Sequence, residues 1–381
     1  MTSLKVAVLG GGHAGRALAG YLSLKGNVVS LYNRTIENVA AIRDAGGINV
    51  QGVVEGYAPI DLVSDRMAEI VPGQDILLVT VPAQAHKFYA REMSQWLEDG
   101  QTLLIMPGAT GGAIEFSNIF DANTNRADIL LGEAQTFSFV SRTVDPHTVL
   151  LSKIKNTVRI SALPAISNHE LIESLNRTPL SFDLVENVLE TSLGNVNALL
   201  HPAPMVLNAG LIESQCGGFL HYHDLISESV GNLIERMDEE RINIARKFSL
   251  DSATLLEWLT EVYDAKGNTL CECLKSIDTY DAVTCATNLN HRYIHEDIPT
   301  GLVPISDIGR LVDIKTPAID SIISMASQVC QQDFRSIGRS VESLGLSGMG
   351  IDELREYVDV GIKNPEYLPI LKSRDLPIEE L

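Results

Sequence analysis

The sequence predicts an α/β protein in which a Rossmann-type, doubly wound sheet is followed by an all-helical C-terminal domain. Three observations support this prediction. Short apolar runs alternate with helical stretches over residues 4–106. A glycine-rich loop joins the first apolar run to the first helical stretch, and beyond residue 183 the apolar residues repeat at helical spacing. Strands separated by helices of this length form a mostly parallel sheet covered on both faces.

The first half supplies the predicted sheet and its covering helices. We expect strands at Lys5–Leu9, Asn27–Tyr32, Asp75–Val81 and Thr102–Met106, a further strand or hairpin at Gly47–Val54, and helices at Ala14–Lys25, Ile36–Ala45 and Ala83–Leu97. Two later strand-like runs, at 148–152 and 157–162, are expected to complete the domain. The first domain is therefore predicted to span residues 1–182.

The second half is predicted to be helical. Its helices are expected at Leu184–Leu200, Val230–Phe248, Ala253–Tyr263 and Pro317–Leu344. The acidic run Asp238–Glu240 is expected on a solvated helix face. These helices are predicted to form a second domain, residues 183–350. The tail of residues 351–381 is expected to be an extra helix or a frayed end.

The net charge of −20 limits the partners of this chain of 381 residues. It repels nucleic acid and anionic lipid, so we expect neither nucleic acid nor a membrane as a partner. No cationic, apolar leader and no uninterrupted apolar run of about 18 residues occurs, so a cytoplasmic protein is predicted. The expected partners are small molecules. The sequence leaves the oligomeric state open, and a homodimer is compatible with it.

No bound metal is expected. The five cysteines are scattered and are interpreted as reduced thiols. Cys271 and Cys273 form a C-x-C pair, but no second pair completes a zinc site. The histidine pairs at 291/295 and 221/223 have suitable spacing, yet neither has a clear third ligand.

The glycine-rich loop, "LGGGHAG", predicts a dinucleotide site. Gly10 permits the tight turn after the first strand, Gly12 lets the backbone approach a pyrophosphate, and Gly15 lets the helix pack closely on the sheet. The predicted cofactor-binding residues of this loop are Gly10, Gly12, His13, Ala14 and Gly15. The strand before the loop and the helix after it are the context that this motif requires. A purely structural glycine turn is the alternative.

The end of the second strand predicts NADP(H) as the cofactor, with NAD as the alternative. An acidic residue there would bind a ribose 2′-hydroxyl, but this chain has Asn33, Arg34 and Thr35. Arg34 can pair with a 2′-phosphate, and its two neighbours can hydrogen-bond to it. Arg34 could instead stack on adenine or face solvent.

Loops after the later predicted strands lie at the carboxyl edge of the sheet, where the rest of the cofactor and its substrate bind. They have the sequences "TVPAQAH" (80–86) and "MPGATGG" (106–112). From these loops we assign Val81 and Pro82 to the cofactor site, and we expect Thr110 to donate a hydrogen bond to the substrate.

Charged side chains crowd the segment "HRYIHEDIPTG" (291–301), in which six of the first seven residues are ionisable. This segment, "ENVLETSLGNVNALLHPAPMVLNAG" (186–210) and the two glycine-containing loops together resemble the octopine/nopaline (opine) dehydrogenase family. The bacterial N-(carboxyethyl)-amino-acid dehydrogenases look most similar. The likeness extends over residues 4–350.

The resemblance implies a Rossmann domain and a helical domain with the active site in the cleft between them. It implies that the amino group of an amino acid condenses with a 2-oxo acid such as pyruvate, with NAD(P)H as reductant. His201, in an N-x-N-…-H-P segment, and Arg292 and Asp297, in an R-Y-…-E-D segment, are the implied catalytic residues. The chain departs from the family pattern at Asn33-Arg34, where several members carry an acidic, NAD-type residue.

The same three residue types suit imine reduction on chemical grounds. A guanidinium such as that of Arg292 can bind a carboxylate with two hydrogen bonds. An imidazole such as that of His201 can move protons near neutral pH. A carboxylate such as that of Asp297 can orient the imidazole and stabilise its protonated form. Because His201 precedes Pro202, its backbone is expected to avoid the helical region, at a helix end or a break.

Other interpretations remain open at this point. Arg292 and Asp297 could form a structural ion pair, and His201 could be a capping or core histidine. A reductase similar to ketopantoate reductase is a second candidate function, although the expected helix Leu184–Leu200 lacks the lysine that such an enzyme would use. A non-catalytic NADP-binding sensor is a third.

Overall fold

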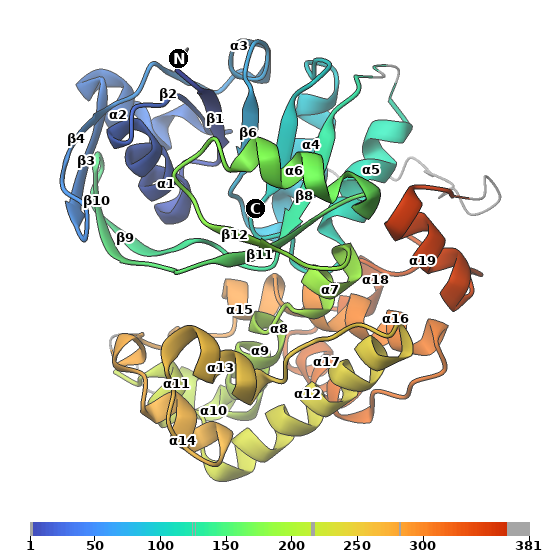
Figure 1. Ribbon diagram of the computed structural model, residues 1–381. Helices are drawn as coiled ribbons and strands as arrows, with labels where there is room; N and C mark the ends of the chain where they lie inside the picture. The colour runs from blue at the N-terminus through green and yellow to red at the C-terminus, as the bar shows by residue number, and fades with distance from the viewer. Residues whose placement is uncertain (1–2, 124, 126, 215–217, 282, 364–381) are drawn as a thin grey trace.

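The computed structural model describes residues 3–123, 125, 127–214, 218–281 and 283–363. Figure 1 shows an α/β half, drawn above, and a helical half, drawn below. The predicted fold class is confirmed.

Eight strands form the main sheet, in the order β12-β11-β8-β7-β6-β1-β2-β5. Their bounds are β1 Lys5–Leu9, β2 Val28–Tyr32, β5 Leu62–Ser64, β6 Ile76–Val79, β7 Thr102–Ile105, β8 Leu130–Ala134, β11 Val158–Ala162 and β12 Phe182–Leu184. Neighbouring strands are parallel except β8 and β11. The strand order reverses between β1 and β6. The carboxyl ends of these two strands therefore border the crevice in which this kind of sheet binds its ligand.

A second sheet of four strands, in the order β4-β3-β10-β9, covers α1 on the far side from the main sheet. Its strands are β3 Gly47–Gly52, β4 Gly56–Pro59, β9 Phe139–Asp145 and β10 Thr148–Ile154. The strands expected at 47–54 and 148–152 are present, but they belong to this second sheet rather than to the main one. The β9–β10 hairpin is antiparallel and brings Thr143 beside His13, at the start of α1.

The helices of the α/β half lie on both faces of the main sheet. They are α1 His13–Leu24, η1 Ile36–Asn38, α2 Ala40–Ala45, α3 Met67–Ile70, η2 Ala83–Ala85, α4 His86–Ser94, α5 Gly112–Asp121, η3 Ala165–Ser167 and α6 Asn168–Leu175. The buried residues of α1 join one apolar core, and those of α4 and α5 join another. The helix expected at 36–45 is divided into η1 and α2, and the one expected at 83–97 ends at Ser94.

The helical half contains more breaks than its periodicity predicted. Its elements are α7 Val188–Leu193, α8 Asn197–Leu200, α9 Pro202–Leu207, α10 Ala209–Ser214, α11 His221–Asp224, α12 Glu228–Lys247, α13 Leu255–Tyr263, α14 Leu270–Lys275, η4 Asp278–Tyr280, α15 Arg292–His295, η5 Ile298–Leu302, α16 Val303–Leu311, α17 Pro317–Val329 and α18 Phe334–Ile337. The helix expected at 184–200 begins only after the Asn187 cap and ends first at Gly194. The helix expected at 317–344 likewise ends at Val329 and is followed by α18.

The expectation that the acidic run in α12 lies on a solvated face holds for Glu239, which is exposed, but is wrong for Asp238 and Glu240. Asp238 is buried and accepts hydrogen bonds from the Arg241 guanidinium and the Leu255 amide. Glu240 accepts hydrogen bonds from the amides of Ala318 and Ile319, at the start of α17. Both carboxylates therefore bind the N-terminal amides of neighbouring helices, which favour negative charge.

The tail predicted as an extra helix or a frayed end contains the helix α19, Ile351–Val360. It packs against η3, and the Asn187 amide donates a hydrogen bond to Asp359. In Figure 1 this helix lies at the right, beside α5. Residues 364–381 of the tail lie outside the described residues.

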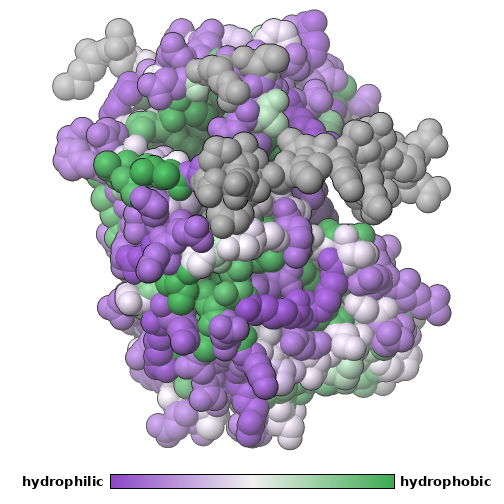
Figure 2. Space-filling view, turned by 90° about the vertical axis from the view of Figure 1, so that its right-hand side faces the viewer, coloured by the Kyte–Doolittle hydropathy of each residue, from purple (hydrophilic) through white to green (hydrophobic). Residues whose placement is uncertain are grey.

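Apolar packing continues from one half into the other. Val79 and Ile105 in the main sheet belong to the same buried cluster as Leu199 and Ile244 in the helical half. Burial of this kind contributes about 25 cal/mol per Å² of apolar surface, so it stabilises the arrangement of the two halves. On the face drawn in Figure 2, hydrophilic residues cover most of the surface and hydrophobic ones gather in smaller patches. Within the described ranges, no helix is long and apolar enough to cross a membrane.

Candidate active site

The glycine loop between β1 and α1 has the shape that a dinucleotide needs. Gly10 has a φ of 126°, which side-chain-bearing residues rarely adopt. A Cβ on Gly15 would lie 1.7 Å from the Gly10 carbonyl oxygen, so only glycine lets α1 start so close to β1. No heavy atom lies within 4 Å of the place that a Cβ on Gly12 would take. The residues present therefore fit a pyrophosphate that approaches the backbone at Gly12.

The other predicted cofactor residues surround this loop. Val81 is buried next to Gly10, and Pro82 is exposed beside it. His13 is exposed, and its Nδ1 lies 2.9 Å from the Thr143 amide nitrogen, so this ring fastens the β9–β10 hairpin to the start of α1. Ala14 is half-buried in the first turn of α1.

Asn33 and Arg34 at the end of β2 have different surroundings. The Asn33 side chain accepts a hydrogen bond from the Gly11 amide and donates one to the Thr35 carbonyl, so it shapes the glycine loop. Arg34 is exposed, and its guanidinium carbon lies 5.4 Å from the centre of the Phe88 ring. No carboxylate occurs at positions 33–35. The Phe88 ring therefore holds the Arg34 guanidinium at the carboxyl end of β2. In this kind of sheet, the adenosine part of a dinucleotide binds there.

His201 and Asp297 form a buried pair between the helical elements. His201 lies at the junction of α8 and α9, and Asp297 immediately precedes η5. His201 Nδ1 lies 2.8 Å from Asp297 Oδ2, and each residue is only 6% exposed. The side chain of His201 does not cap α9, so the capping interpretation does not hold. Its backbone is in the helical region (φ −93°, ψ −55°), contrary to the expectation from Pro202, although it does lie at a break.

Burial controls the protonation of this pair. Removal from water disfavours both charged forms, and it lowers the pKa of His201 to about 3 and raises the pKa of Asp297 to about 7. The nearby Arg292 guanidinium lowers both values. The two shifts describe one unit, because the pair holds a single proton between about pH 3 and pH 7. The buried pair can therefore give up or take a proton near neutral pH.

Aromatic side chains fix the ring of His201. Tyr293 stacks on it, with ring centres 3.8 Å apart and an angle of 15° between the planes. The Tyr222 hydroxyl lies 3.1 Å from His201 Nε2. Both ring nitrogens therefore have partners. His221, also buried, lies against Tyr293 and donates from Nε2 to the Leu200 carbonyl.

Arg292 pairs with Glu296 rather than with Asp297. Its Nε lies 2.8 Å from Glu296 Oε2, while Glu296 Oε1 accepts a hydrogen bond from the Ala83 amide in the loop after β6. The Arg292 side chain is 52% exposed. No ion pair joins Arg292 to Asp297 in the part of the chain that the structure describes, so the proposed structural pair between these two is not formed. The guanidinium is held by one carboxylate and remains accessible.

A cavity of about 780 Å³ opens beside Arg292. Arg292 and His291 line one side of it, and its other walls come from η2, α4, α5, η5 and the region of α18. The lining residues include Ala83, Gln84, Lys87, Glu115, Thr300 and Arg339. Three cationic side chains and one carboxylate line it, so the cavity is locally positive in a protein of charge −20. Such a cavity can attract anionic substrates.

Thr110 does not face this cavity. It is fully buried, and its hydroxyl donates to the Ser192 carbonyl and accepts from the Asn195 side-chain amide. Its own amide donates to the Thr300 carbonyl. The polar groups of Thr110 therefore join the loop after β7 to α7 and η5, and they leave no free donor for a substrate in this arrangement.

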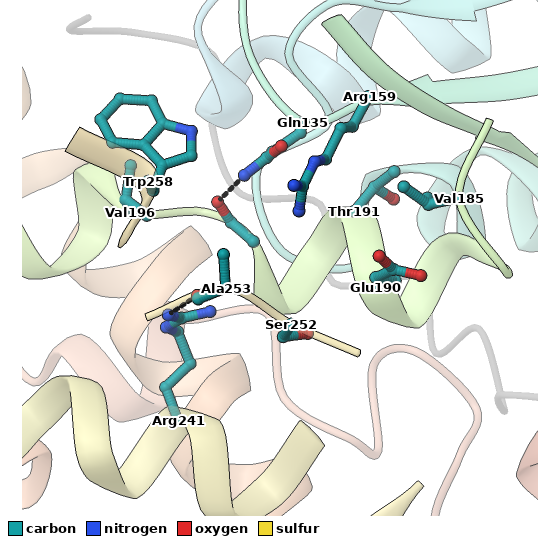
Figure 3. Close-up of a pocket in the computed structure, with 11 residues that line it drawn as sticks. Gln135, Arg159, Val185, Glu190, Thr191, Val196, Arg241, Ser252, Ala253 and Trp258 are labelled. Carbon is teal, nitrogen blue, oxygen red and sulfur yellow. Dashed lines mark hydrogen bonds between the residues drawn. The ribbon is translucent and has the colours of Figure 1, made fainter. Parts of the chain in front are cut away.

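A second cavity lies at the junction of the two halves, between β8 and α12 (Figure 3). Figure 3 shows Gln135 pointing toward the break between α7 and α8, where its amide donates to the Gly194 carbonyl, and Arg241 reaching the Ala253 carbonyl. The space measures about 10 Å³, roughly the room that one water molecule occupies. It is too small for a substrate.

Three polar residues near the site were not predicted. Tyr222 and Arg339 have no local sequence signal, because only packing brings them to the centre and the cavity. Glu133 could have been noticed, since it is a carboxylate within an apolar strand, "ILLGEA". It is fully buried in β8 and accepts hydrogen bonds from the Ala113 amide and the Thr191 and Ser192 hydroxyls.

Comparisons with known proteins identify the family of the chain. Residues 184–330 match the model of the family "NAD/NADP octopine/nopaline dehydrogenase, alpha-helical domain". Residues 5–113 match "NAD-dependent glycerol-3-phosphate dehydrogenase N-terminus". An opine dehydrogenase from Arthrobacter sp. (strain 1C) is 38% identical over 354 residues, which cover 93% of this chain and 98% of the relative.

Two solved structures share the fold. Octopine dehydrogenase in complex with NADH and agmatine has a TM-score of 0.78 at 18% identity, and the match covers 95% of this chain and 99% of that one. Yersinopine dehydrogenase with bound NADP+ has a TM-score of 0.72 at 16% identity, and covers 94% and 98%. Relatives of this fold therefore bind both forms of the nicotinamide cofactor. The chain belongs to the octopine/nopaline (opine) dehydrogenase family and is an NAD(P)-dependent oxidoreductase that acts on CH–NH groups.

Proposed function

We propose that the chain is an NADP(H)-dependent opine dehydrogenase that condenses the amino group of an amino acid with a 2-oxo acid such as pyruvate. The observation that carries this proposal is the buried His201–Asp297 pair beside an accessible arginine, in a chain of this family. NADP(H), when bound, supplies the hydride that reduces the imine carbon.

Each of the three residues has one role in the proposed reaction. Arg292, which lines the 780 Å³ cavity, binds the carboxylate of the 2-oxo acid. His201 moves the protons of carbinolamine formation and water loss. Asp297, 2.8 Å from His201 Nδ1, orients the imidazole and shares with it the one proton that the pair holds below about pH 7. Burial of the pair excludes water, which strengthens these interactions.

The preference for NADP(H) is proposed from the end of β2. Arg34 is exposed, and its guanidinium lies over the Phe88 ring. Positions 33–35 contain no carboxylate that would repel a 2′-phosphate. We expect Arg34→Asp to shift the preference toward NADH, measured as kcat/KM for each cofactor. Arg43→Asp is the matched control, because this exposed arginine on α2 already pairs with Asp44. Equal loss with both cofactors would contradict the assignment.

A substrate panel tests the reaction itself. The purified protein is mixed with NADPH, pyruvate and single amino acids, and NADPH oxidation is followed. Turnover should require both the oxo acid and an amine. Oxidation without any amine would instead identify a 2-oxo acid or ketone reductase, and NADPH binding without turnover would identify a sensor.

The competing functions have less support. The two helices α7 and α8, which replace the single expected helix, contain no lysine of the kind that a ketopantoate-reductase-like enzyme would use. A sensor would retain the glycine loop but would have no need for a buried imidazole–carboxylate pair beside an accessible guanidinium.

A further inference from the structure

The second nitrogen of His201 is not free. Asp297 holds Nδ1, so in the proposed reaction only Nε2 can exchange a proton with the substrate. The Tyr222 hydroxyl lies 3.1 Å from that atom, and Tyr222 is only 6% exposed. A proton that enters or leaves His201 at Nε2 must therefore pass through Tyr222, unless Tyr222 moves away.

Neighbouring rings keep Tyr222 in place. Tyr280 stacks on it, with ring centres 4.0 Å apart and an angle of 20°. His221 meets it edge-on at 4.9 Å. Moving the Tyr222 hydroxyl away from His201 would require several packed aromatic rings to shift. A close-packed interior resists such a shift.

A second hydroxyl continues the path. The Tyr293 ring stacks on His201, and its side chain interacts with that of Tyr222, which lowers the pKa of Tyr293. Tyr293 is less buried than Tyr222 and directly follows Arg292, the residue that would hold the oxo acid. Burial raises the pKa of both phenols, and Tyr222 lies well above its ordinary value, so both hydroxyls stay protonated near neutral pH. A protonated hydroxyl can donate one hydrogen bond while it accepts another.

We propose that Tyr222 and Tyr293 relay the proton of His201 to the substrate. The inference rests on the proposed function. In the dehydration step, the Tyr293 proton passes to the hydroxyl of the carbinolamine, its C–O bond breaks, water leaves and the nitrogen lone pair forms the C=N bond. Tyr293 takes the proton of Tyr222, Tyr222 takes the Nε2 proton of His201, and Asp297 gives its proton to His201 Nδ1. Both phenols and the imidazole end neutral, Asp297 becomes a carboxylate, and the iminium group carries the positive charge.

Phenylalanine substitutions test the relay, because they remove a hydroxyl and keep the ring. Tyr222→Phe and Tyr293→Phe should each lower kcat about 10- to 100-fold, with KM for NADPH within about twofold of wild type. Tyr280→Phe is the matched control. Its ring is stacked in the same cluster, but the hydroxyl on His201 Nε2 is that of Tyr222, so kcat should remain near wild type. Equal kcat for the Tyr222 and Tyr280 variants, or a faster Tyr222 variant, would overturn the relay.

A double-variant comparison separates a relay from a structural role. His201→Ala alone should reduce turnover by about 10²- to 10⁴-fold while NADPH affinity is kept. If Tyr222 acts through His201, adding Tyr222→Phe to that variant should lower kcat no further. An additive loss would contradict the proposal, and near-normal turnover of His201→Ala would remove His201 from the mechanism.

A readout that does not depend on turnover distinguishes failure of the relay from failure of the proposed function. The ¹⁵N NMR signals of the His201 ring should change in Tyr222→Phe, because Nε2 loses its partner, and should stay as in wild type in Tyr280→Phe. Unchanged ring signals in Tyr222→Phe overturn the relay. No turnover by the wild type in the substrate panel overturns the proposed function instead.

Discussion

A single proton shared by two buried side chains sets the pH response of the site. The His201–Asp297 pair holds one proton between about pH 3 and pH 7. In the unfolded chain the same two groups also hold one proton, between about pH 3.9 and pH 6.5. Folding moves that proton but does not change the number bound, so this pair should give the free energy of unfolding little pH dependence between those limits.

Reaction rates should respond to the same proton. Because reductive condensation consumes a proton, kcat/KM in that direction should fall as the pH rises through about 7, where the pair loses its proton. The oxidative direction should rise over the same range. Initial rates measured in both directions from pH 5 to pH 9 at constant ionic strength check this expectation.

Asp297→Asn tests the assignment of that proton. The variant should lose the change near pH 7, and its kcat should fall about 10²-fold or more, because the imidazole loses its charged partner. Asp183→Asn, an exposed residue on β12, is the control and should keep the wild-type profile. A profile in Asp297→Asn that still turns near pH 7 would mean that another group carries the proton.

At the scale of elements, the glycine motif between β1 and α1 meets two different requirements: close packing of the helix on the strand, and room for the ligand. Gly15 serves packing, because a Cβ there would meet the Gly10 carbonyl at 1.7 Å. Gly12 serves the ligand, because the space in front of it is open. Glycines of the same loop are therefore needed for different reasons.

Alanine at these two positions should give opposite results. Gly15→Ala should lower the Tm, because α1 must move away from β1 to relieve the clash. Gly12→Ala should keep the Tm of the protein without ligand but weaken NADPH binding by at least about tenfold, because a methyl group would take the room of the pyrophosphate. Thermal unfolding and NADPH titration measure both variants. Tight NADPH binding by Gly12→Ala would place the pyrophosphate elsewhere.

At the scale of the molecule, the buried side chain of Arg339 connects the helical half to the α/β half. Its side chain is 1% exposed, and it donates to the Thr110 carbonyl at 2.9 Å and to Glu115 at 2.7 Å. It therefore links the chain after α18 to the loop and the helix that follow β7. Arg339 and Glu115 also line the large cavity, so this contact shapes the candidate active site.

Removing Arg339 should destabilise the whole molecule. Arg339→Met leaves Glu115 buried with only Lys87 nearby, at 3.7 Å, and the free energy of unfolding should fall by about 3–5 kcal/mol. Arg310→Met is the control, because its pair with Asp307 involves a guanidinium side chain that is 52% exposed and should contribute about 1 kcal/mol or less. Denaturant unfolding measures both.

The double variant Arg339→Met/Glu115→Gln gives a further check. It should recover part of the stability lost by Arg339→Met, because no unpaired charge remains buried. If the double variant is no more stable than Arg339→Met, the hydrogen bonds from Arg339 to the Thr110 and Gly108 carbonyls matter more for stability than the ion pair.

Features that depend on local pattern could be predicted without the structure. Apolar periodicity predicted the strands β1, β2, β6 and β7, and the spacing of Gly10, Gly12 and Gly15 predicted the turn between β1 and α1. Such features follow from backbone geometry and from neighbours a few residues apart. His201, Arg292 and Asp297 were predicted through chemistry and resemblance, without knowledge of their contacts. The helix breaks at Gly194 and after Val329 were missed, because apolar spacing continues across them.

The partners of the charged groups could not be predicted, because they depend on how distant segments pack. Asp297 and Glu296 are adjacent in sequence, yet one binds His201, 96 residues away, and the other binds Arg292 and the Ala83 amide. Tyr222 on Nε2 and Arg339 in the cavity wall were likewise placed by packing, which also turned Asp238 and Glu240 of α12 toward neighbouring helices. The physical reason is that a buried polar group must find a partner wherever folding brings one, and no local spacing encodes that choice.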